Sequence, residues 1–263
     1  MSTEHVLDHR PESPVRARPR ASASKVPEVT VCFWIVKVLT TGIGETASDL
    51  LAKVLGPIPA VGLGGLAFVA ALVLRCTVRR YVAWIYWTAV VMVSVFGTMA
   101  ADVLHVGLGV PYTLSAPLFL LALAAVFALR YARTLSIDTV RTRRREGFSW
   151  AAVLATFALG TAAGDLTASI GLGYLGSAVL FAVAIAVPAL AHRGGVLGAV
   201  SAFWAAYVIT RPLGASLADW MADPSGRGGL GWGLGPVTLS WTVAIVAFVA
   251  FLALSRRDGE AAV

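Results

Sequence analysis

The sequence is poor in charged residues. Of its 263 residues, only 13% are Asp, Glu, Lys or Arg, whereas a soluble globular domain usually contains about 25%. Hydrophobic residues make up 58% of the chain, and the mean hydropathy is +0.79. This composition excludes an ordinary soluble enzyme and predicts an integral membrane protein, with the lipid bilayer as its first partner.

The sequence also lacks the signatures of catalysis and of cofactor binding. It contains no HExxH, GxSxG or Walker motif, which mark metalloproteases, serine hydrolases and nucleotide-binding proteins. The two cysteines, Cys32 and Cys76, form neither a CxxC pair nor a metal-binding spacing and are expected to be buried or boundary thiols. We therefore predict that the protein is not an enzyme and has no cofactor.

Residues 1–28 differ in composition from the rest of the chain. They are polar, with Lys and Arg residues among Pro, Ser and Ala, and they contain no apolar run typical of a secretory signal peptide. Such a segment buries too little apolar surface to fold alone. We predict a disordered cytoplasmic tail at 1–28, a transmembrane domain at 29–257 and a short cytoplasmic tail at 258–263.

Eight long apolar segments follow the tail. A helix needs roughly 20 residues to cross a hydrocarbon core of ~30 Å, and each segment is about that long. Backbone groups inside a bilayer must be hydrogen-bonded within the protein, which favours helices. The sequence therefore predicts an all-α polytopic membrane protein with eight transmembrane helices. They lie near Val29–Leu55, Ile58–Leu74, Val82–Leu104, Tyr112–Leu129, Phe148–Ile170, Leu172–Ala191, Val196–Met221 and Val237–Leu254.

Basic residues are distributed unevenly between the two sets of connections. Lys and Arg are frequent in the tail, after the second and fourth segments and at the C-terminus, whereas the opposite connections contain only Lys53 and Arg227. Because loops rich in Lys and Arg stay in the cytoplasm, both termini are predicted to be cytoplasmic. The net charge of +7 thus has a topological explanation, and nucleic acid is not expected as a partner.

The odd-numbered segments share a repeated pattern. Each contains Trp-x14-Asp, with a Gly five residues before the Asp. The Trp residues are Trp34, Trp87, Trp150 and Trp204; the Gly residues are Gly44, Gly97, Gly160 and Gly214; the Asp residues are Asp49, Asp102, Asp165 and Asp219. Three fixed positions that recur in four segments indicate an internal repeat. The repeats span about residues 29–76, 81–130, 148–193 and 196–257.

Each repeat is predicted to be a hairpin of two membrane helices. Because two helices per repeat leave every repeat in the same orientation, we expect a pseudo-fourfold axis along the membrane normal. The four Asp residues then lie at one depth, in the outer half of the bilayer. The Trp residues are expected to be anchors at the cytoplasmic interface, and the Gly residues are expected to allow close helix packing.

Four acidic residues inside membrane helices need an explanation, because a charge in hydrocarbon costs on the order of 3 kcal/mol. We interpret Asp49, Asp102, Asp165 and Asp219 as a ring of cation ligands. The position four residues before each Asp lies on nearly the same helix face, and it holds Glu45, Thr98, Thr161 and Ala215. Carboxylate and hydroxyl oxygens suit Mn2+, Mg2+ or Ca2+, so the expected metal ligands are the four Asp residues and Glu45, with Thr98 and Thr161 completing the substrate site.

Two other interpretations of these residues remain open. In the first interpretation, the Asp residues are structural polar groups that hydrogen-bond to neighbouring hairpins, and they bind no ligand. The other concerns the intramembrane cations Lys37 and Arg211, which we include among the substrate-binding residues. If both point inward, the site is less negative, and an anion or a small organic solute becomes a candidate substrate.

The first repeat resembles a known family. The segments Lys25-Val-Pro-Glu-Val-Thr30, Phe33-Trp34-x2-Lys37 and Gly44-Glu45-Thr46-x2-Asp49 resemble a bacterial membrane protein family built from four tandem copies of a repeat of unknown function. The resemblance covers about residues 25–257. It implies a multi-pass protein of the bacterial inner membrane and transfers no catalytic residues. The later repeats depart from Gly-Glu-Thr at Thr98, Thr161 and Ala215.

The sequence favours transport as the function. We expect a transporter or exporter of a cation, with a divalent metal as the first candidate, that acts through the ring of intramembrane Asp residues. A non-transporting membrane anchor or regulatory module is one alternative, and a carrier of a small organic solute is another. The sequence leaves a homo-oligomer open.

Overall fold

A computed structural model describes residues 29–78, 81–131 and 143–255. The predicted tails at 1–28 and 258–263 lie outside the described residues. Within these ranges all regular structure is helical, as predicted. The main helices are α1 (Val31–Leu55), α2 (Pro57–Thr77), α3 (Ala83–Asp102), α4 (Tyr112–Tyr131), α5 (Arg143–Thr167), α6 (Gly173–Ala184), α7 (Ala186–Arg193), α8 (Ala199–Ala222) and α9 (Leu234–Ser255).

The sixth apolar segment is two helices rather than the one expected. The helix breaks at Ile185, between α6 and α7. Pro188 explains the break, because proline has no N–H to donate to the carbonyl four residues earlier. By contrast, α8 continues through Pro212.

The third and fifth segments end differently from the others. After α3 the chain forms a π-helical turn, η1 (Val103–Gly107), and after α5 it forms η3 (Ala168–Leu172). At the end of η3, the chain turns back through Gly171 and Gly173, whose φ angles are +109° and +66°. Glycine adopts this region without the steric cost of a Cβ atom. Both π-helical turns follow shortly after a repeat Asp.

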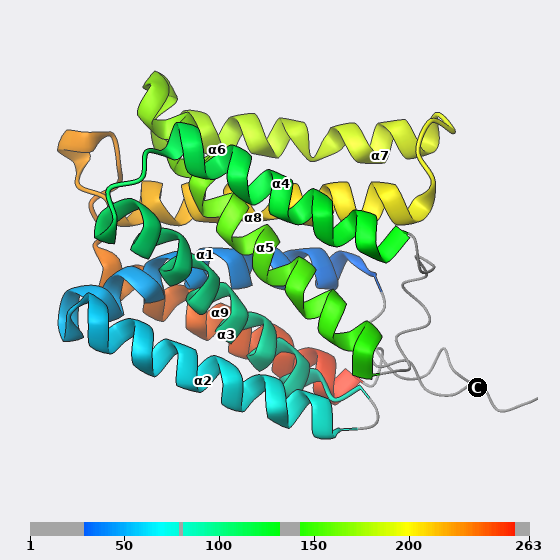
Figure 1. Cartoon of the computed structure of the whole chain (residues 1–263). Coiled ribbons are helices and arrows are strands. Elements are labelled where there is room, and N and C mark those ends of the chain that lie inside the picture. The colour runs from blue at the N-terminus through cyan, green and yellow to red at the C-terminus, as the bar shows by residue number, and fades with distance from the viewer. Residues whose placement is uncertain (1–28, 79–80, 132–142, 256–263) are drawn as a thin grey trace, which may run out of the picture.

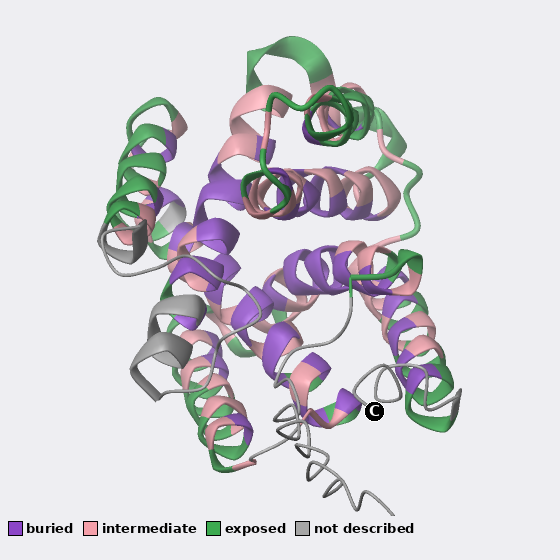
Figure 2. Ribbon diagram, turned by 90° about the vertical axis from the view of Figure 1, so that its right-hand side faces the viewer, coloured by how far each residue is buried: buried purple, intermediate pink, exposed green. Residues whose placement is uncertain are grey.

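Four helices form a closed ring at the centre of the bundle. Helix α1 contacts α3, α3 contacts α5, α5 contacts α8, and α8 contacts α1. The other helices surround the ring (Figure 1). Each outer helix packs mainly on the ring helix of the next repeat: α2 on α3, α4 on α5, α6 on α8, and α9 back on α1. The view in Figure 2 shows buried residues concentrated on the ring helices and exposed residues on the outer ones.

The repeated glycines lie at the ring contacts, as expected for small packing residues. A Cβ atom on Gly44 would collide with Ser94 on α3, one on Gly97 with Phe157 on α5, one on Gly160 with Arg211 on α8, and one on Gly214 with Thr41 on α1. Each repeat therefore uses the same glycine to approach the next ring helix. Such close backbone approach is how helices associate where lipid removes the hydrophobic driving force.

The outer surface is apolar. Leu66 on α2, Leu121 on α4, Val183 on α6 and Val246 on α9 are all well exposed. Four helical stretches of the described residues are long and apolar enough to cross a membrane: Pro57–Thr77, Ala83–His105, Trp150–Arg193 and Leu234–Leu254. The third stretch is 44 residues long and reverses direction near Gly171. These stretches are the features expected of a membrane protein.

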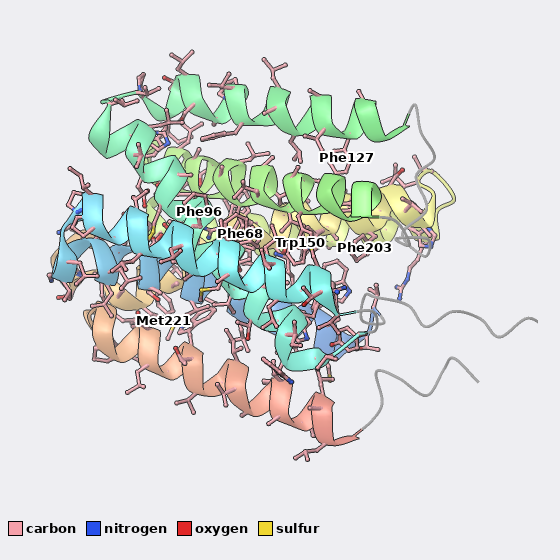
Figure 3. All side chains as sticks on the ribbon, turned by 60° about the horizontal axis from the view of Figure 1, so that its bottom comes forward. Phe68, Phe96, Phe127, Trp150, Phe203 and Met221 are labelled. Carbon is pink, nitrogen blue, oxygen red and sulfur yellow. The ribbon has the colours of Figure 1, made fainter. Side chains whose placement is uncertain are left out.

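The repeat tryptophans belong to the hydrophobic core of the bundle or pack against it. Trp87 and Trp150 are buried, and Trp34 and Trp204 are half-buried. They belong to a connected aromatic layer in the N-terminal halves of the ring helices, with ring centroids 5.3–6.3 Å apart. Its members are Phe33, Trp34, Tyr86, Trp87, Trp150, Phe203, Trp204 and Tyr207. Figure 3 shows Phe203 and Met221 towards opposite ends of the bundle. Packing against neighbouring aromatic rings buries Trp87 and Trp150, and the depth of the four Trp residues at the cytoplasmic interface stays a prediction.

Candidate functional site

An open cavity of about 990 Å³ lies at the C-terminal ends of the ring helices. This volume is at the upper end of the range for pockets that bind small molecules. The aromatic layer occupies the opposite halves of the same helices. The bundle is therefore hollow near one end and filled with aromatic side chains near the other.

The structure brings the four repeat Asp residues together in this cavity. Asp49, Asp102, Asp165 and Asp219 all line it, each from a different ring helix, and each side chain is half-buried. Each carboxyl group also lies close enough to Glu45 to interact with it electrostatically. The other lining residues are Glu45, Ser48, Ala52, Pro57, Ile58, Ala60, Val61, Met99, Val103, Gly107, Tyr112, Ala168, Ser169, Gly173, Tyr174 and Arg227. Five acidic side chains and one basic side chain make the cavity attractive to cations.

The outer helices add hydroxyl groups to the cavity. Tyr112, at the start of α4, lies within electrostatic reach of Asp165. Tyr174, near the start of α6, lies within electrostatic reach of Asp219. At the rim, Arg227 approaches the partly buried Asp223, with 3.7 Å between the charged atoms. Sequence reasoning missed both tyrosines. The sequence offered one signal for them, because each tyrosine is the first or second residue of the helix that follows a repeat Asp.

The carboxyl groups do not form a compact metal-binding cluster. Among the residues that the structure describes, no group of three or more His, Cys, Asp or Glu side chains is placed to hold a metal ion. Metal ligation by Asp49, Asp102, Asp165 and Asp219 therefore stays a prediction. His105, which follows Asp102 by three residues, contacts the carbonyl of Val110 at 2.9 Å and the hydroxyl of Ser115 at 3.2 Å. These contacts give His105 a hydrogen-bonding role beside the start of α4.

Glu45 is paired with Arg211 below the cavity. The distance from Arg211 Nη2 to Glu45 Oε2 is 2.7 Å, and both side chains are buried. The same nitrogen contacts the hydroxyls of Thr161, at 2.6 Å, and of Thr98. Arg211 Nη1 also donates to the carbonyl of Thr41, at 3.2 Å. Glu45 lines the cavity as well, so it links the cavity to this buried cluster.

The cluster is built from equivalent positions of three repeats. Glu45, Thr98 and Thr161 each stand four residues before a repeat Asp, as the predicted oxygen set requires. Position 215 of the fourth repeat is Ala, and this repeat supplies Arg211 one turn earlier. Gly160 leaves the space through which the Arg211 side chain passes. We define Glu45, Thr98 and Thr161 as the oxygen ring. The predicted set converges, and Arg211 lies at its centre.

Lys37 is the next charged residue along the ring helices. Its side chain is 1% exposed, and Nζ has no hydrogen-bond partner among the described residues. Instead, Nζ lies over the rings of Phe157 and Tyr207, 4.2 Å and 4.1 Å from their centroids. An ammonium group is attracted to aromatic faces. Lys37 and Arg211 thus both point into the bundle.

The aromatic partners of Lys37 were missed from the sequence, although the repeat offers a signal. Phe157 stands eight residues before Asp165, and Arg211 stands eight residues before Asp219. Likewise, Tyr207 and Lys37 each stand twelve residues before a repeat Asp. Residues at the same separation from a repeat Asp occupy equivalent positions of the ring helices, and positions four residues apart are neighbours on a helix surface. Alignment of the repeats on the Asp residues therefore places all four side chains on the inner face of the ring.

Replacement of Lys37 by methionine is expected to stabilise the protein. The ammonium group is buried without an acceptor, and a thioether of similar shape removes the cost of its dehydration. A gain in unfolding free energy of about 1–3 kcal/mol is expected from apolar replacements of buried ions. Thermal unfolding of the purified protein in detergent measures it. The matched control is Lys53→Met near the end of α1, which should leave the melting temperature unchanged. A Lys37→Met protein that melts well below the wild type would show that the ammonium group is needed for stability.

Comparison with known proteins gives a family without an assigned activity. No curated protein and no solved structure matches the chain. The family model described as Repeat of Unknown Function (DUF347) matches four times, at residues 32–81, 85–135, 148–193 and 202–258. These matches coincide with the four repeats seen in the sequence and with the four hairpins of the structure. Since they cover most of its length, the chain belongs to this four-repeat family.

Proposed function

We propose that the protein is a membrane transporter or exporter of a cation, with a divalent metal as the first candidate. The observation that carries the proposal is that Asp49, Asp102, Asp165 and Asp219 line a single cavity. All four repeats supply this carboxylate at the same position of the Trp-x14-Asp pattern. Acidic residues inside a membrane domain commonly mark an ion pathway.

The proposal includes a topology. All eight repeat segments cross the membrane, with α6 and α7 together forming one crossing, and the repeats follow a pseudo-fourfold axis. The sequence of contacts around the ring supports this arrangement, since the ring helix of each repeat packs against the ring helix of the next. The basic connections favour cytoplasmic termini in a bacterial inner membrane. The acidic cavity then opens away from the cytoplasm.

The shape of the cavity favours a cation that keeps some of its water. A cavity of about 990 Å³ is much larger than a bare ion, and the carboxyl groups are spread around its wall. Hard cations such as Mg2+ retain several waters and are often held by one or two carboxylates. The four Asp residues therefore act as a capture site, from which the cation moves towards Glu45 and the oxygen ring.

Neutralisation of one cavity carboxylate is expected to lower flux about tenfold or more at cation concentrations below saturation. In Asp49→Asn and Asp102→Asn, loss of a charged contact worth about 1.5–3 kcal/mol lowers cation binding on the order of tenfold or more. Uptake of Mn2+, Mg2+ and Ca2+ into proteoliposomes, together with the metal content of expressing cells, measures the effect. Asp223→Asn is the matched control, because this carboxyl lies at the rim beside Arg227. Unchanged flux in both cavity variants would overturn the proposal.

The inward orientation of Lys37 and Arg211 favours a second candidate, a carrier of a small organic solute. Two buried cations offset part of the acidic charge, and the cavity has the volume for a small molecule. Methylammonium, choline and acetate in the same uptake assay distinguish this candidate from metal transport. If the Asp variants alter folding but no solute moves in the wild type, the protein is a non-transporting membrane module.

A further inference from the structure

We propose that the oxygen ring of Glu45, Thr98 and Thr161 is an inner cation site and that Arg211 is its tethered occupant. A cation that arrives from the cavity replaces the guanidinium group in this ring. The inference rests on the proposed function, because it assigns the next position on the path of the transported cation. It makes Arg211 a built-in competitor rather than a purely structural partner of Glu45.

The first argument is the convergence of oxygen atoms on one point. One carboxylate oxygen and two hydroxyl oxygens, from three different ring helices, surround a single nitrogen of Arg211. Thr161 Oγ1 is also 3.5 Å from both Glu45 Oε2 and Thr98 Oγ1. The ring thus encloses a volume about the size of one atom. Carboxylate and hydroxyl oxygens that converge in this way are typical ligands of hard cations.

The second argument is that a guanidinium group fits this ring poorly. A terminal guanidinium nitrogen has two hydrogens, yet Arg211 Nη2 faces three acceptors at once. The Nε hydrogen, by contrast, has no partner among the described residues. A well-matched Arg–carboxylate pair uses two parallel hydrogen bonds, whereas Glu45 accepts a hydrogen bond from only one nitrogen of Arg211. A spherical ion has no directional limit on its contacts and satisfies all three oxygens.

The third argument is the position of the ring on the path. Glu45 lines the acidic cavity and is also a member of the oxygen ring, so a cation in the cavity meets the ring through this carboxylate. A displaced guanidinium has another partner nearby, because Arg211 Cζ is 5.3 Å from the centroid of the Phe157 ring. Arg211 also packs against Gly160. Its displacement therefore acts on the contact between α5 and α8.

Chemical rescue tests the proposal without a transport assay. In Arg211→Ala, the ring is left free, and Na+, Mn2+ or free guanidinium ion at millimolar concentration should bind there and raise the melting temperature, with the metal ions effective at lower concentration than guanidinium. The wild type should show no such rise, because its own arginine fills the ring. In the double variant Glu45→Gln/Arg211→Ala, the rise should be lost, since the carboxylate that attracts the ion has been removed.

A second variant guards against loss of folding in Arg211→Ala. Arg211→Gln keeps an amide that donates to Glu45 but removes the positive charge. This variant should bind Mn2+ or Na+ at least about tenfold more tightly than the wild type, equivalent to 1.4 kcal/mol. Isothermal titration measures the affinity. The proposal is overturned if Arg211→Ala gains no stability from guanidinium and Arg211→Gln gains no affinity for either metal ion.

The outcomes separate this proposal from the proposed function. If Asp49→Asn lowers flux but neither Arg211 variant responds to a cation, the cavity transports and the inner site is wrong. If guanidinium rescues Arg211→Ala while the wild type moves no solute, the oxygen ring binds cations and transport is wrong. The two failures therefore have different signatures in the same set of proteins.

Discussion

Replacement of Glu45 by glutamine is expected to destabilise the protein by about 3–5 kcal/mol, the usual cost of breaking a buried ion pair from one side. Arg211 would remain fully buried among Thr98, Thr161 and Thr41 without a negative partner. The Arg211 side chain is fully buried, so water compensates little of the attraction that it loses. Thermal or urea unfolding in detergent, followed by circular dichroism, measures the loss.

The double variant Glu45→Gln/Arg211→Gln is the informative control. It removes both charges while it keeps groups of similar shape, so most of the stability should return. The coupling energy between the two sites is then at least about 2 kcal/mol, which a double-mutant cycle resolves. At the rim, Asp223→Asn breaks an ion pair in which Arg227 is 72% exposed and should cost under about 1 kcal/mol. If the double variant is as unstable as Glu45→Gln, the ion pair is not the source of the effect.

Replacement of Gly214 by leucine is expected to prevent assembly of the ring. A Cβ atom at this position would lie 2.8 Å from the carbonyl oxygen of Val38 and 2.9 Å from Thr41 Cβ. The Val38 oxygen belongs to the backbone of α1 and cannot rotate away, so α1 and α8 must separate. Overpacking of this kind costs about 1–3 kcal/mol in soluble cores and occasionally more. We expect the upper end here and a large loss of monodisperse protein in size-exclusion chromatography.

Gly62→Ala is the matched control for this substitution. Gly62 also lies inside a helix, α2, but a Cβ atom there meets no atom within 4 Å. The change should be neutral or slightly stabilising, because alanine has about 1 kcal/mol better helix propensity than glycine. A Gly214→Leu protein with normal yield and melting temperature would contradict the close contact between α1 and α8.

Spacing alone was sufficient to find the repeat and the residues that converge. Residues four positions apart share a helix face, and this rule placed Glu45, Thr98 and Thr161 beside one another before any contact was known. The glycine at minus five recurs at the same position of every repeat, so it marks an equivalent helix contact in each of them. Periodicity of this kind depends only on the geometry of a single helix, so it can be predicted without knowledge of how the helices pack.

The partner of the oxygen ring was not predictable in the same way. Periodicity gives the inner face of α8 but not how far a long side chain extends across the bundle. Arg211 stands one turn before Ala215, yet it contacts the residues equivalent to Ala215 on three other helices. That reach depends on the space beside Gly160, which is a property of the assembled ring. The aromatic layer was missed for a related reason, since burial of Trp87 depends on neighbours from other repeats.

The way in which α9 packs back on α1 has a consequence for how such a chain evolves. A solenoid of stacked hairpins gains or loses units at its ends, because each unit touches only its neighbours in line. Here the head-to-tail contact returns to its starting point, as in a cyclic oligomer. A fifth repeat could be inserted only if all the helix crossing angles in the ring changed. Deletion of one repeat would expose the contact surfaces of its two neighbours. Duplication therefore stops at the number that completes the circle, and later divergence acts on the individual members.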